Sequence, residues 1–326
     1  MSITGAYMRL GDALKGAISR DESMAKHTTY RIGGPVGLYI ECATLSDLST
    51  TSTVLAEEEV PCAVVGKGSN LLVSDEGFPG AVVTLTDEFT RMNFSAVEDE
   101  GQPEEGTAVP QEGSGANDIA KVTLGGGATL ARVVQRAYRD SLSGLEFAVG
   151  IPGTVGGAIA MNAGSRTEWM GMLVDTVTTY VPGKGLVCRR GTDIAWGYRQ
   201  TDIPRNEIIV ETTLRLREGS TALIRQNMER RRRRRQHSQP LDLPSCGSVF
   251  RNPEGKSVAQ LIDACGLAGE TRGNAQISTK HANFIVNLGG ASALDVLELI
   301  HLARGRVKET YGIELQPEVR FLGFSH

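Results

Sequence analysis

The glycine-rich stretch GIPGTVGGAIAMNAG, which runs from Gly150 to Gly164, is the part of the chain best suited to holding a ligand. Glycine loses much conformational freedom on folding, so a chain concentrates it where side chains would obstruct another group. That group is either a neighbouring backbone or a flat or anionic ligand lying against peptide N–H groups. The stretch alone leaves both interpretations open.

A second polar turn, GKGSN at Gly66–Asn70, lies between the apolar runs Pro61–Val65 and Leu71–Val73, which predict strands. Such a turn suits a diphosphate, because small residues let its oxygens approach several N–H donors at once. The turn is not a P-loop, since no Gly-x-x-x-x-Gly-Lys-Ser/Thr run leads into a helix. It is not a Rossmann fingerprint either, since no Gly-x-Gly-x-x-Gly opens a helix after the strand.

Together, GKGSNLLVSDEGFPG and GIPGTVGGAIAMNAG resemble the UDP-N-acetylenolpyruvoylglucosamine reductases, flavoenzymes that make UDP-N-acetylmuramate for peptidoglycan. The resemblance spans nearly the whole chain in the expected order, continuing at Thr28–Pro35, Gly197–Arg199, Pro244–Asn252 and Leu315–Arg320. The interval between Leu186 and Leu216 is short, as in the smaller subtype of the family that lacks a substrate-gripping tyrosine loop.

The resemblance implies an α+β fold, with a flavin-binding region of the PCMH/vanillyl-alcohol-oxidase type and a smaller C-terminal α+β substrate domain. It also implies FAD as cofactor and NADPH as reductant of UDP-N-acetylglucosamine enolpyruvate. In that reaction a hydride adds to the terminal carbon of the enolpyruvyl ether, and a proton then reaches the carbon bearing the carboxylate. The site therefore needs a hydride carrier, cationic groups on the carboxylate and a positioned acid.

Arg199 is the candidate for binding the carboxylate. A guanidinium holds a carboxylate as a fork and stabilises it as negative charge develops. Composition alone favours a surface arginine here. The match of residues 197–199 to the family's Gly-Tyr-Arg motif implies the catalytic role.

The candidate proton donors lie in PSCGSVF, where Ser245, Cys246 and Ser248 all carry protic groups. The residues alone do not choose among them. The resemblance selects Ser248, the hydroxyl directly after the glycine. Some relatives carry cysteine at that position, which fits a protic side chain rather than a nucleophile. Cys246 is interpreted as a small packed thiol.

Glu318 and Arg320 alternate on a short predicted strand, so their side chains point the same way. An ion pair at a strand edge is the plain interpretation. The resemblance implies instead that Glu318 assists protonation and that Arg320 lies near the substrate. As a hydrogen-bond donor, Glu318 would have to stay protonated, which requires burial.

The resemblance also assigns binding residues. Flavin contacts carry over to Gly66, Lys67, Gly68, Ser69, Asn70, Ile151, Pro152, Gly153, Thr154, Gly157, Asn162, Ala163, Gly164 and Ile209. Substrate contacts carry over to Asn252, Lys280, His281, Asn283 and Arg320. For His281, an ordinary partly buried histidine is an equally good interpretation. No metal site is expected, because the five cysteines are scattered without metal-ligand spacing.

The composition, 40% hydrophobic and 22% charged, is that of a globular protein. No apolar run is long enough to span a bilayer, and the first 20 residues lack the core of a signal peptide. Scattered cysteines suit reduced thiols in the cytosol. We therefore expect a cytoplasmic monomer that acts on a small-molecule UDP-sugar, with no membrane partner.

The pattern of expected elements divides the chain into three parts. They are an N-terminal helical segment (1–25), an FAD-binding region (26–218, with subdomains of about 26–86 and 87–218) and a C-terminal substrate-binding domain (219–326). In the first part, Leu10, Leu14 and Ile18 follow helical spacing. Ser46-Asp47 predicts a helix start. In the last part, Leu294, Leu297 and Ile300 indicate the apolar face of a helix with a Ser292–Asp295 capping box and Gly312 near its end.

Between about 98 and 118 the chain is acidic and has almost no large apolar side chains. It cannot bury enough surface to offset its ordering entropy, so we interpret it as a mobile surface insertion. A partner-binding tail is the alternative.

Six arginines, Arg230–Arg235, raise the possibility of a nucleic-acid-binding protein. On a helix they point all round, so they cannot all meet one phosphate surface, and the net charge of -4 gives no general affinity for nucleic acid. We interpret the run as a solvated helix end, and a contact to the substrate diphosphate is a further hypothesis.

The alternative enzyme function is that of another PCMH-type FAD oxidoreductase. Such an enzyme would lack the combination of Arg199, Ser248 and Glu318.

Overall fold

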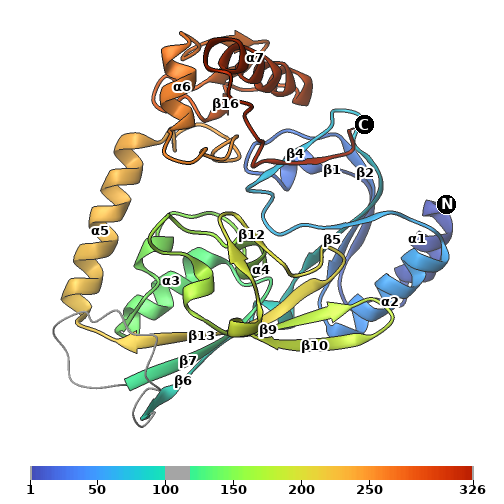
Figure 1. The fold of residues 1–326 in the computed structure, drawn as a ribbon. Coiled ribbons are helices and arrows are strands. Elements are labelled where there is room, and N and C mark those ends of the chain that lie inside the picture. The colour runs from blue at the N-terminus through green and yellow to red at the C-terminus, as the bar shows by residue number, and fades with distance from the viewer. Residues whose placement is uncertain (1, 100–117, 325–326) are drawn as a thin grey trace. The chain divides into compact units, whose positions relative to one another are not determined.

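The computed structural model describes residues 2–99 and 118–324, and the chain divides into two compact units (Figure 1). The first unit comprises Met1–Glu41, Thr50–Thr84 and Arg234–His326. The second comprises Cys42–Ser49 and Leu85–Arg233. Each is described by itself, and the three-part division of the sequence stays a prediction.

The N-terminal half of the first unit is built on a four-stranded sheet of order β1-β2-β5-β3. Its strands are β1 (Ile18–Ser23), β2 (Pro35–Cys42), β5 (Phe78–Leu85) and β3 (Cys62–Val64), and helix α1 spans Ile3–Gly11. The helical spacing predicted as far as Ile18 is therefore wrong beyond Gly11. Residues 18–23 instead pair antiparallel with β2, because the partner strand supplies backbone hydrogen bonds that local spacing does not reveal.

Helix α2 (Leu45–Glu57) begins one residue earlier than the predicted start at Ser46-Asp47, with Thr44 directly before its first residue. The Thr44 hydroxyl accepts from the N–H of Asp47 at 3.1 Å, and the Asp47 carboxylate accepts from the N–H of Ala43 at 3.0 Å. These side chains satisfy backbone donors that the first turn leaves without helical partners. Asp47 thus belongs to the start signal, with Thr44 as its partner.

The C-terminal half of the first unit packs α6 (Val258–Ala264) and α7 (Ala293–Tyr311) around one apolar cluster (Figure 1). The predicted capping box between Ser292 and Asp295 is present, and Gly312 ends α7 in the left-handed conformation. The predicted apolar face is partly wrong, because Leu294 is 58% exposed. The buried face is Ala293, Val296, Leu299, Ile300, Ala303 and Val307.

Two small sheets complete this unit. A three-stranded antiparallel sheet has the order β14-β15-β16, from Thr271–Arg272, Ala275–Ile277 and Ile285–Asn287. Strand β4 (Leu71–Val73) pairs in parallel with the C-terminal strand β17 (Arg320–Leu322). That pairing connects the residues after the GKGSN turn to the residues after Glu318.

The second unit is a sheet of order β10-β9-β13-β7-β6, with β8 paired to β13. The strands are β10 (Gly185–Arg190), β9 (Val174–Val181), β13 (Ile208–Glu218), β7 (Asp118–Gly125), β6 (Met92–Asp99) and β8 (Leu142–Ser143). Helices α3 (Leu130–Arg139) and α4 (Val155–Ala160) pack on it through one apolar core. The face of α3 that packs on the sheet consists of the buried residues Leu130, Val133, Val134 and Ala137.

The acidic segment predicted at about 98–118 begins and ends in strands, because Asp99 of β6 pairs with Asp118 of β7. Residues 100–117 lie outside the described part of the chain. Helix α5 (Thr221–Ser238) carries the arginine run. No helix within residues 2–99 and 118–324 has the length and apolarity needed to cross a membrane.

Candidate active site

The GKGSN turn follows β3 and leads into β4. Gly68 is buried with a φ of 58°, and a Cβ there would lie 2.3 Å from the carbonyl oxygen of His27, so only glycine fits. Within the described residues, the N–H groups of Gly66, Lys67 and Gly68 have no acceptor. A turn that leaves adjacent N–H groups available fits the diphosphate of a dinucleotide such as FAD.

The same turn is bonded to the segment that contains Glu318. The side-chain amide of Asn70 donates to the carbonyl oxygen of Glu318 at 3.0 Å. The N–H of Arg320 donates to the carbonyl oxygen of Asn70 at 3.0 Å. Predicted cofactor residues and a predicted catalytic residue, which are far apart in sequence, therefore lie together in the first unit.

Ser248 and Glu318 lie on neighbouring stretches of backbone. The N–H of Glu318 donates to the carbonyl oxygen of Val249 at 2.7 Å, and Phe250 forms an antiparallel bridge with Pro317. Both predicted catalytic side chains are half-buried. A hydroxyl and a carboxyl group thus come from adjacent backbone positions, as a shared role in proton transfer requires.

Cys246 is buried beneath this segment, beside the fully buried Tyr30. Burial raises the pKa of the Cys246 thiol to about 12, and the negative charge of Glu318 acts in the same direction. Such a thiol is an inert packing group at neutral pH. The hydroxyl of Thr29 also donates to the carbonyl oxygen of Ser245 at 2.7 Å, so the TTYRIGG motif braces the PSCGSVF segment.

In the second unit, the GIPGTVGGAIAMNAG stretch divides its glycines between two uses. A Cβ on Gly156 would lie 3.0 Å from the carbonyl oxygen of Gly126, so this glycine serves backbone packing. At Gly157 a Cβ would meet only the Thr154 hydroxyl, at 3.5 Å. Among the described residues, the N–H groups of Gly153 and of the buried Thr154 have no acceptor. The packing interpretation therefore holds at Gly156, while Gly153 and Thr154 have N–H groups available to a ligand, whose binding stays a prediction.

Asn162 has both atoms of its side-chain amide bonded to the protein. Its nitrogen donates to the carbonyl oxygen of Gly197 at 2.9 Å, and its oxygen accepts from the N–H of Gly171 at 3.0 Å. The residue is 5% exposed. A flavin contact by Asn162 stays a prediction, and its side chain serves the neighbouring backbone.

Arg199 lies in the turn of a small hairpin, between β11 (Trp196–Gly197) and β12 (Gln200–Thr201). Its φ is 59°, and one guanidinium nitrogen donates to the carbonyl oxygen of Gly164 at 2.8 Å. The predicted carboxylate-binding residue is thus fixed to the end of the glycine-rich stretch. Ile209, predicted to lie beside the cofactor, is a buried residue of β13.

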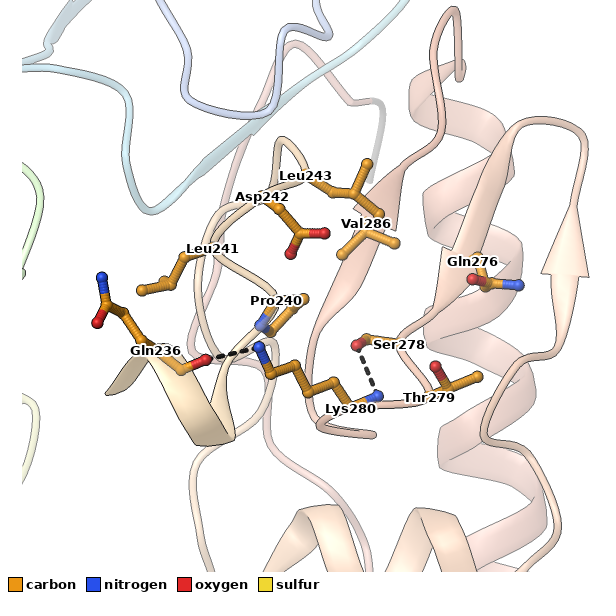
Figure 2. Close-up of a pocket in the computed structure, with 10 residues that line it drawn as sticks. All are labelled: Gln236, Pro240, Leu241, Asp242, Leu243, Gln276, Ser278, Thr279, Lys280 and Val286. Atoms are coloured by element: carbon orange, nitrogen blue, oxygen red, sulfur yellow. Dashed lines mark hydrogen bonds between the residues drawn. The ribbon is translucent and has the colours of Figure 1, made fainter. Parts of the chain in front are cut away.

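Of the predicted substrate residues, Lys280 lines a pocket of about 610 Å³ in the first unit (Figure 2). Its ammonium group donates to the carbonyl oxygen of Gln236 at 2.6 Å. The pocket is also lined by Pro240, Leu241, Asp242, Leu243, Gln276, Ser278, Thr279 and Val286. Its polar wall groups can receive a polar ligand.

The other predicted substrate residues have structural partners. The side-chain oxygen of Asn252 accepts from the N–H of Val258, at the start of α6, at 2.9 Å. Asn283 is buried and bonds both the N–H and the carbonyl oxygen of Phe250. The half-buried His281 ring lies edge-on against Phe284, and burial lowers its pKa, so the ring is neutral at pH 7.

An ion pair joins Glu168 and Arg231, and no local sequence pattern predicts it. One nitrogen of Arg231 donates to both carboxylate oxygens of Glu168, at 2.8 and 2.6 Å. Arg231 belongs to the arginine run, so at least one member of that run is used inside the second unit. Arg231 cannot be told apart from its neighbours in the run by local sequence, because its partner Glu168 lies 63 residues away.

Within the described residues, no cluster of His, Cys, Asp or Glu is placed to hold a metal ion.

The predicted site residues fall into two sets, one in each unit. The first unit holds the GKGSN turn, Ser248 and Glu318, and the second holds the glycine-rich stretch and Arg199.

Known proteins were compared with the chain. A family model described as "UDP-N-acetylenolpyruvoylglucosamine reductase, C-terminal domain" matches residues 239–322, and one described as "FAD binding domain" matches residues 36–181. The predicted α+β fold with a flavin-binding region and a C-terminal domain is confirmed.

Individual relatives match over nearly their full length. The UDP-N-acetylenolpyruvoylglucosamine reductase of Heliobacterium modesticaldum is 40% identical over 314 residues, which cover 95% of this chain and 92% of the relative. Reductase 2 of Symbiobacterium thermophilum is 39% identical over 310 residues, covering 94% and 93%. The crystal structure of the Thermus caldophilus reductase matches with 34% identity and a TM-score of 0.75, covering 95% of this chain and 99% of that one. The chain belongs to the UDP-N-acetylenolpyruvoylglucosamine reductase family.

Proposed function

We propose that the protein reduces UDP-N-acetylglucosamine enolpyruvate to UDP-N-acetylmuramate, with FAD as cofactor and NADPH as reductant, in peptidoglycan precursor synthesis. Membership of the family supports the reaction class, and the match to an FAD binding domain supports the cofactor. The observation that carries the proposal is the hydrogen bond from Glu318 to Val249, which puts the predicted acid residues on adjacent backbone.

We assign the N–H groups of Gly66, Lys67 and Gly68 to the cofactor diphosphate, and Gly153 and Thr154 stay proposals as cofactor contacts. Bound FAD would accept a hydride from NADPH and deliver it to the enolpyruvyl group. The protein supplies the polar groups around the substrate. Lys280, in the pocket of Figure 2, is assigned to the sugar nucleotide.

The side chains then divide the remaining chemistry. The guanidinium of Arg199 binds the substrate carboxylate, which gains negative charge when the hydride arrives. The Ser248 hydroxyl donates the proton to the carbon bearing that carboxylate. Glu318, whose N–H donates to the carbonyl oxygen of Val249 next to Ser248, is assigned the role of assisting this transfer. Asn252, His281, Asn283 and Arg320 stay proposals as substrate contacts.

The proposal includes a cytoplasmic location and a monomeric state. All five cysteines are free thiols in the structure, which suits a reducing compartment.

The test separates the two half-reactions under anaerobic conditions. NADPH should bleach the bound flavin, and enolpyruvyl UDP-sugar should then restore its colour. Ser248→Ala should keep the first step near the parent rate and slow the second by about 10²-fold or more, where 10² is the lower end of the usual contribution of general acid catalysis. The matched control, Ser245→Ala, should leave both steps intact.

Two outcomes would contradict the proposal in different ways. A parent flavin that NADPH reduces, but that only oxygen reoxidises, would favour another FAD oxidoreductase. A Ser248→Ala variant that is reoxidised by the substrate at the parent rate would remove Ser248 from the role of proton donor and leave the reaction itself in place.

A further inference from the structure

We propose that Asn162 is a positioning residue for Arg199, an inference that rests on the proposed function. The glycine-rich stretch that contains Asn162 was assigned to the cofactor by resemblance. The contacts of the Asn162 side chain point to a different task, which is to hold the hairpin on which Arg199 lies.

Two hydrogen bonds hold the hairpin that carries Arg199. The Asn162 amide nitrogen donates to the carbonyl oxygen of Gly197, two residues before Arg199. From the other side, the guanidinium of Arg199 donates to the carbonyl oxygen of Gly164, two residues after Asn162. The two hydrogen bonds join the same short segments in opposite directions. They therefore fix the hairpin turn against the end of the glycine-rich stretch.

The Asn162 side-chain oxygen also accepts a hydrogen bond from the N–H of Gly171. A Cβ on Gly171 would lie 2.3 Å from the Trp196 ring, so this backbone lies flat against that indole. The Trp196 N–H donates to the carbonyl oxygen of Gly191 at 2.8 Å. Asn162 thus binds both the hairpin backbone and the residue on which the hairpin's tryptophan packs.

The backbone conformation of both residues fits the same role. Asn162 and Arg199 both have positive φ, at 40° and 59°. Residues other than glycine adopt this region at a cost that neighbouring contacts must offset, and such residues concentrate at functional sites. Asparagine tolerates the region better than most residues do. At position 162 an asparagine combines that tolerance with a donor and an acceptor at one site.

Residues 162–169 are also held at their C-terminal end, near Glu168 and Trp169. Gly164 bridges Trp169, and the neighbouring Glu168 binds Arg231 of α5. The carbonyl oxygen that receives the Arg199 guanidinium is therefore supported from both ends of residues 162–169. Asn162 thus holds the backbone around Arg199 through its bonds to Gly171 and Gly197.

Asn162→Asp is the discriminating variant. It keeps the shape and the acceptor for the Gly171 N–H, but sets a carboxylate oxygen against the carbonyl oxygen of Gly197 in place of a donor. Asn93→Asp makes the same charge change at an exposed position of β6 and serves as the matched control. If Asn162→Asp does not fold, Asn162→Gly accepts the positive φ and removes both amide bonds.

The kinetic test compares the half-reactions of these variants. A displaced Arg199 should slow reoxidation by the enolpyruvyl UDP-sugar about 10- to 100-fold, since small misplacements of a catalytic group have effects of that size. Flavin affinity and reduction by NADPH should stay within about twofold of the parent, because Asn162 acts only through Arg199. The double variant Asn162→Asp/Arg199→Ala should react no more slowly than Arg199→Ala alone.

A second readout needs no bound cofactor. Trp169 and Trp196 are the only tryptophans in the chain, and both lie in the segments that Asn162 joins. In the flavin-free protein, Asn162→Asp should shift tryptophan emission to longer wavelength and increase quenching by acrylamide. Asn93→Asp should match the parent.

The outcomes separate this inference from the proposed function. Parent-like reoxidation in Asn162→Asp, additive losses in the double variant, or a tenfold fall in flavin affinity would each overturn the positioning role. If the parent flavin is not reoxidised by the UDP-sugar at all, the proposed function fails. The fluorescence comparison would then still decide whether Asn162 holds the hairpin.

Discussion

The side-chain amide of Asn283 holds both backbone groups of Phe250, accepting from its N–H at 3.0 Å and donating to its carbonyl oxygen at 2.9 Å. Phe250 follows Ser248 by two residues, and both bonded residues are buried. The Asn283 side chain therefore supplies the two hydrogen bonds that a neighbouring strand would make to the Phe250 backbone. Phe250 belongs to the segment that contains Ser248, the proposed proton donor.

Asn283→Ala should destabilise the protein by about 2–4 kcal/mol, because it leaves two buried backbone groups unsatisfied at about 1–2 kcal/mol each. Urea unfolding of the flavin-free protein measures this. Asn252→Ala is the matched control, since it removes only the one bond to the N–H of Val258 and should cost about 1 kcal/mol, as the loss of a helix cap does. Equal losses in the two variants would show that the Asn283 amide does not support the Phe250 backbone.

The elements around these residues show what the sequence could predict. The α7 capping box and Gly312 were predictable because every group involved lies within a few residues of the helix ends. The two glycine-rich stretches were recognisable for the same reason. Local sequence determines local turns and caps.

The supports of the site were not predictable in this way. Asn283 and Phe250 are 33 residues apart, and Asn162 and Gly197 are 35 apart. The family resemblance assigned a ligand contact to each asparagine, and an amide side chain suits that role and a structural one equally well. Only the fold reveals which backbone lies within reach. The same reason accounts for Ile18, whose helical spacing gave way to pairing with β2.

Ser248→Cys should retain part of the second half-reaction, and the retained part should depend on pH. The proposed role needs a protic side chain, and a thiol with an ordinary pKa of about 8.5 is protonated below that pH and unable to donate above it. The reoxidation rate should therefore fall as the pH rises through about 8.5, while the parent rate shows no such loss from its hydroxyl. Stopped-flow reoxidation between pH 6 and 9.5 measures both, and an identical pH profile in the two proteins would contradict a donor at position 248.

The ion pair between Glu207 and Arg189 should make stability depend on pH. Two hydrogen bonds from Arg189, at 2.6 and 2.7 Å, lower the pKa of the Glu207 carboxyl below its ordinary value. A lowered folded pKa means that the unfolded chain binds more protons in acid, so this contribution is present above the unfolded pKa of about 4.3. It is lost as the pH falls through the folded value.

Glu207→Gln should therefore be less stable than the parent by about 2 kcal/mol at pH 7, the usual size for a hydrogen bond to a charged group. The difference should shrink toward pH 3. Thermal or urea unfolding at several pH values measures it. Glu229→Gln, which breaks an exposed pair with Arg225 on α5, should stay close to the parent at every pH. A difference for Glu207→Gln that is the same at pH 3 and pH 7 would rule out this charge effect.

The pair between Glu168 and Arg231 gives the arginine run a specific structural use. Arg231 binds the Glu168 carboxylate at the far end of residues 162–169, whose Gly164 carbonyl receives Arg199. Glu168→Gln should slow reoxidation by the UDP-sugar less than Asn162→Asp does, because Gln still offers one acceptor and the pair is partly exposed. Arg232→Gln, a change at the next, exposed position of α5, removes one positive charge without touching Glu168. If Arg232→Gln slowed the reaction as much as Arg231→Gln, the run would act through its summed charge, and the specific contact to Glu168 would have no part in placing Arg199.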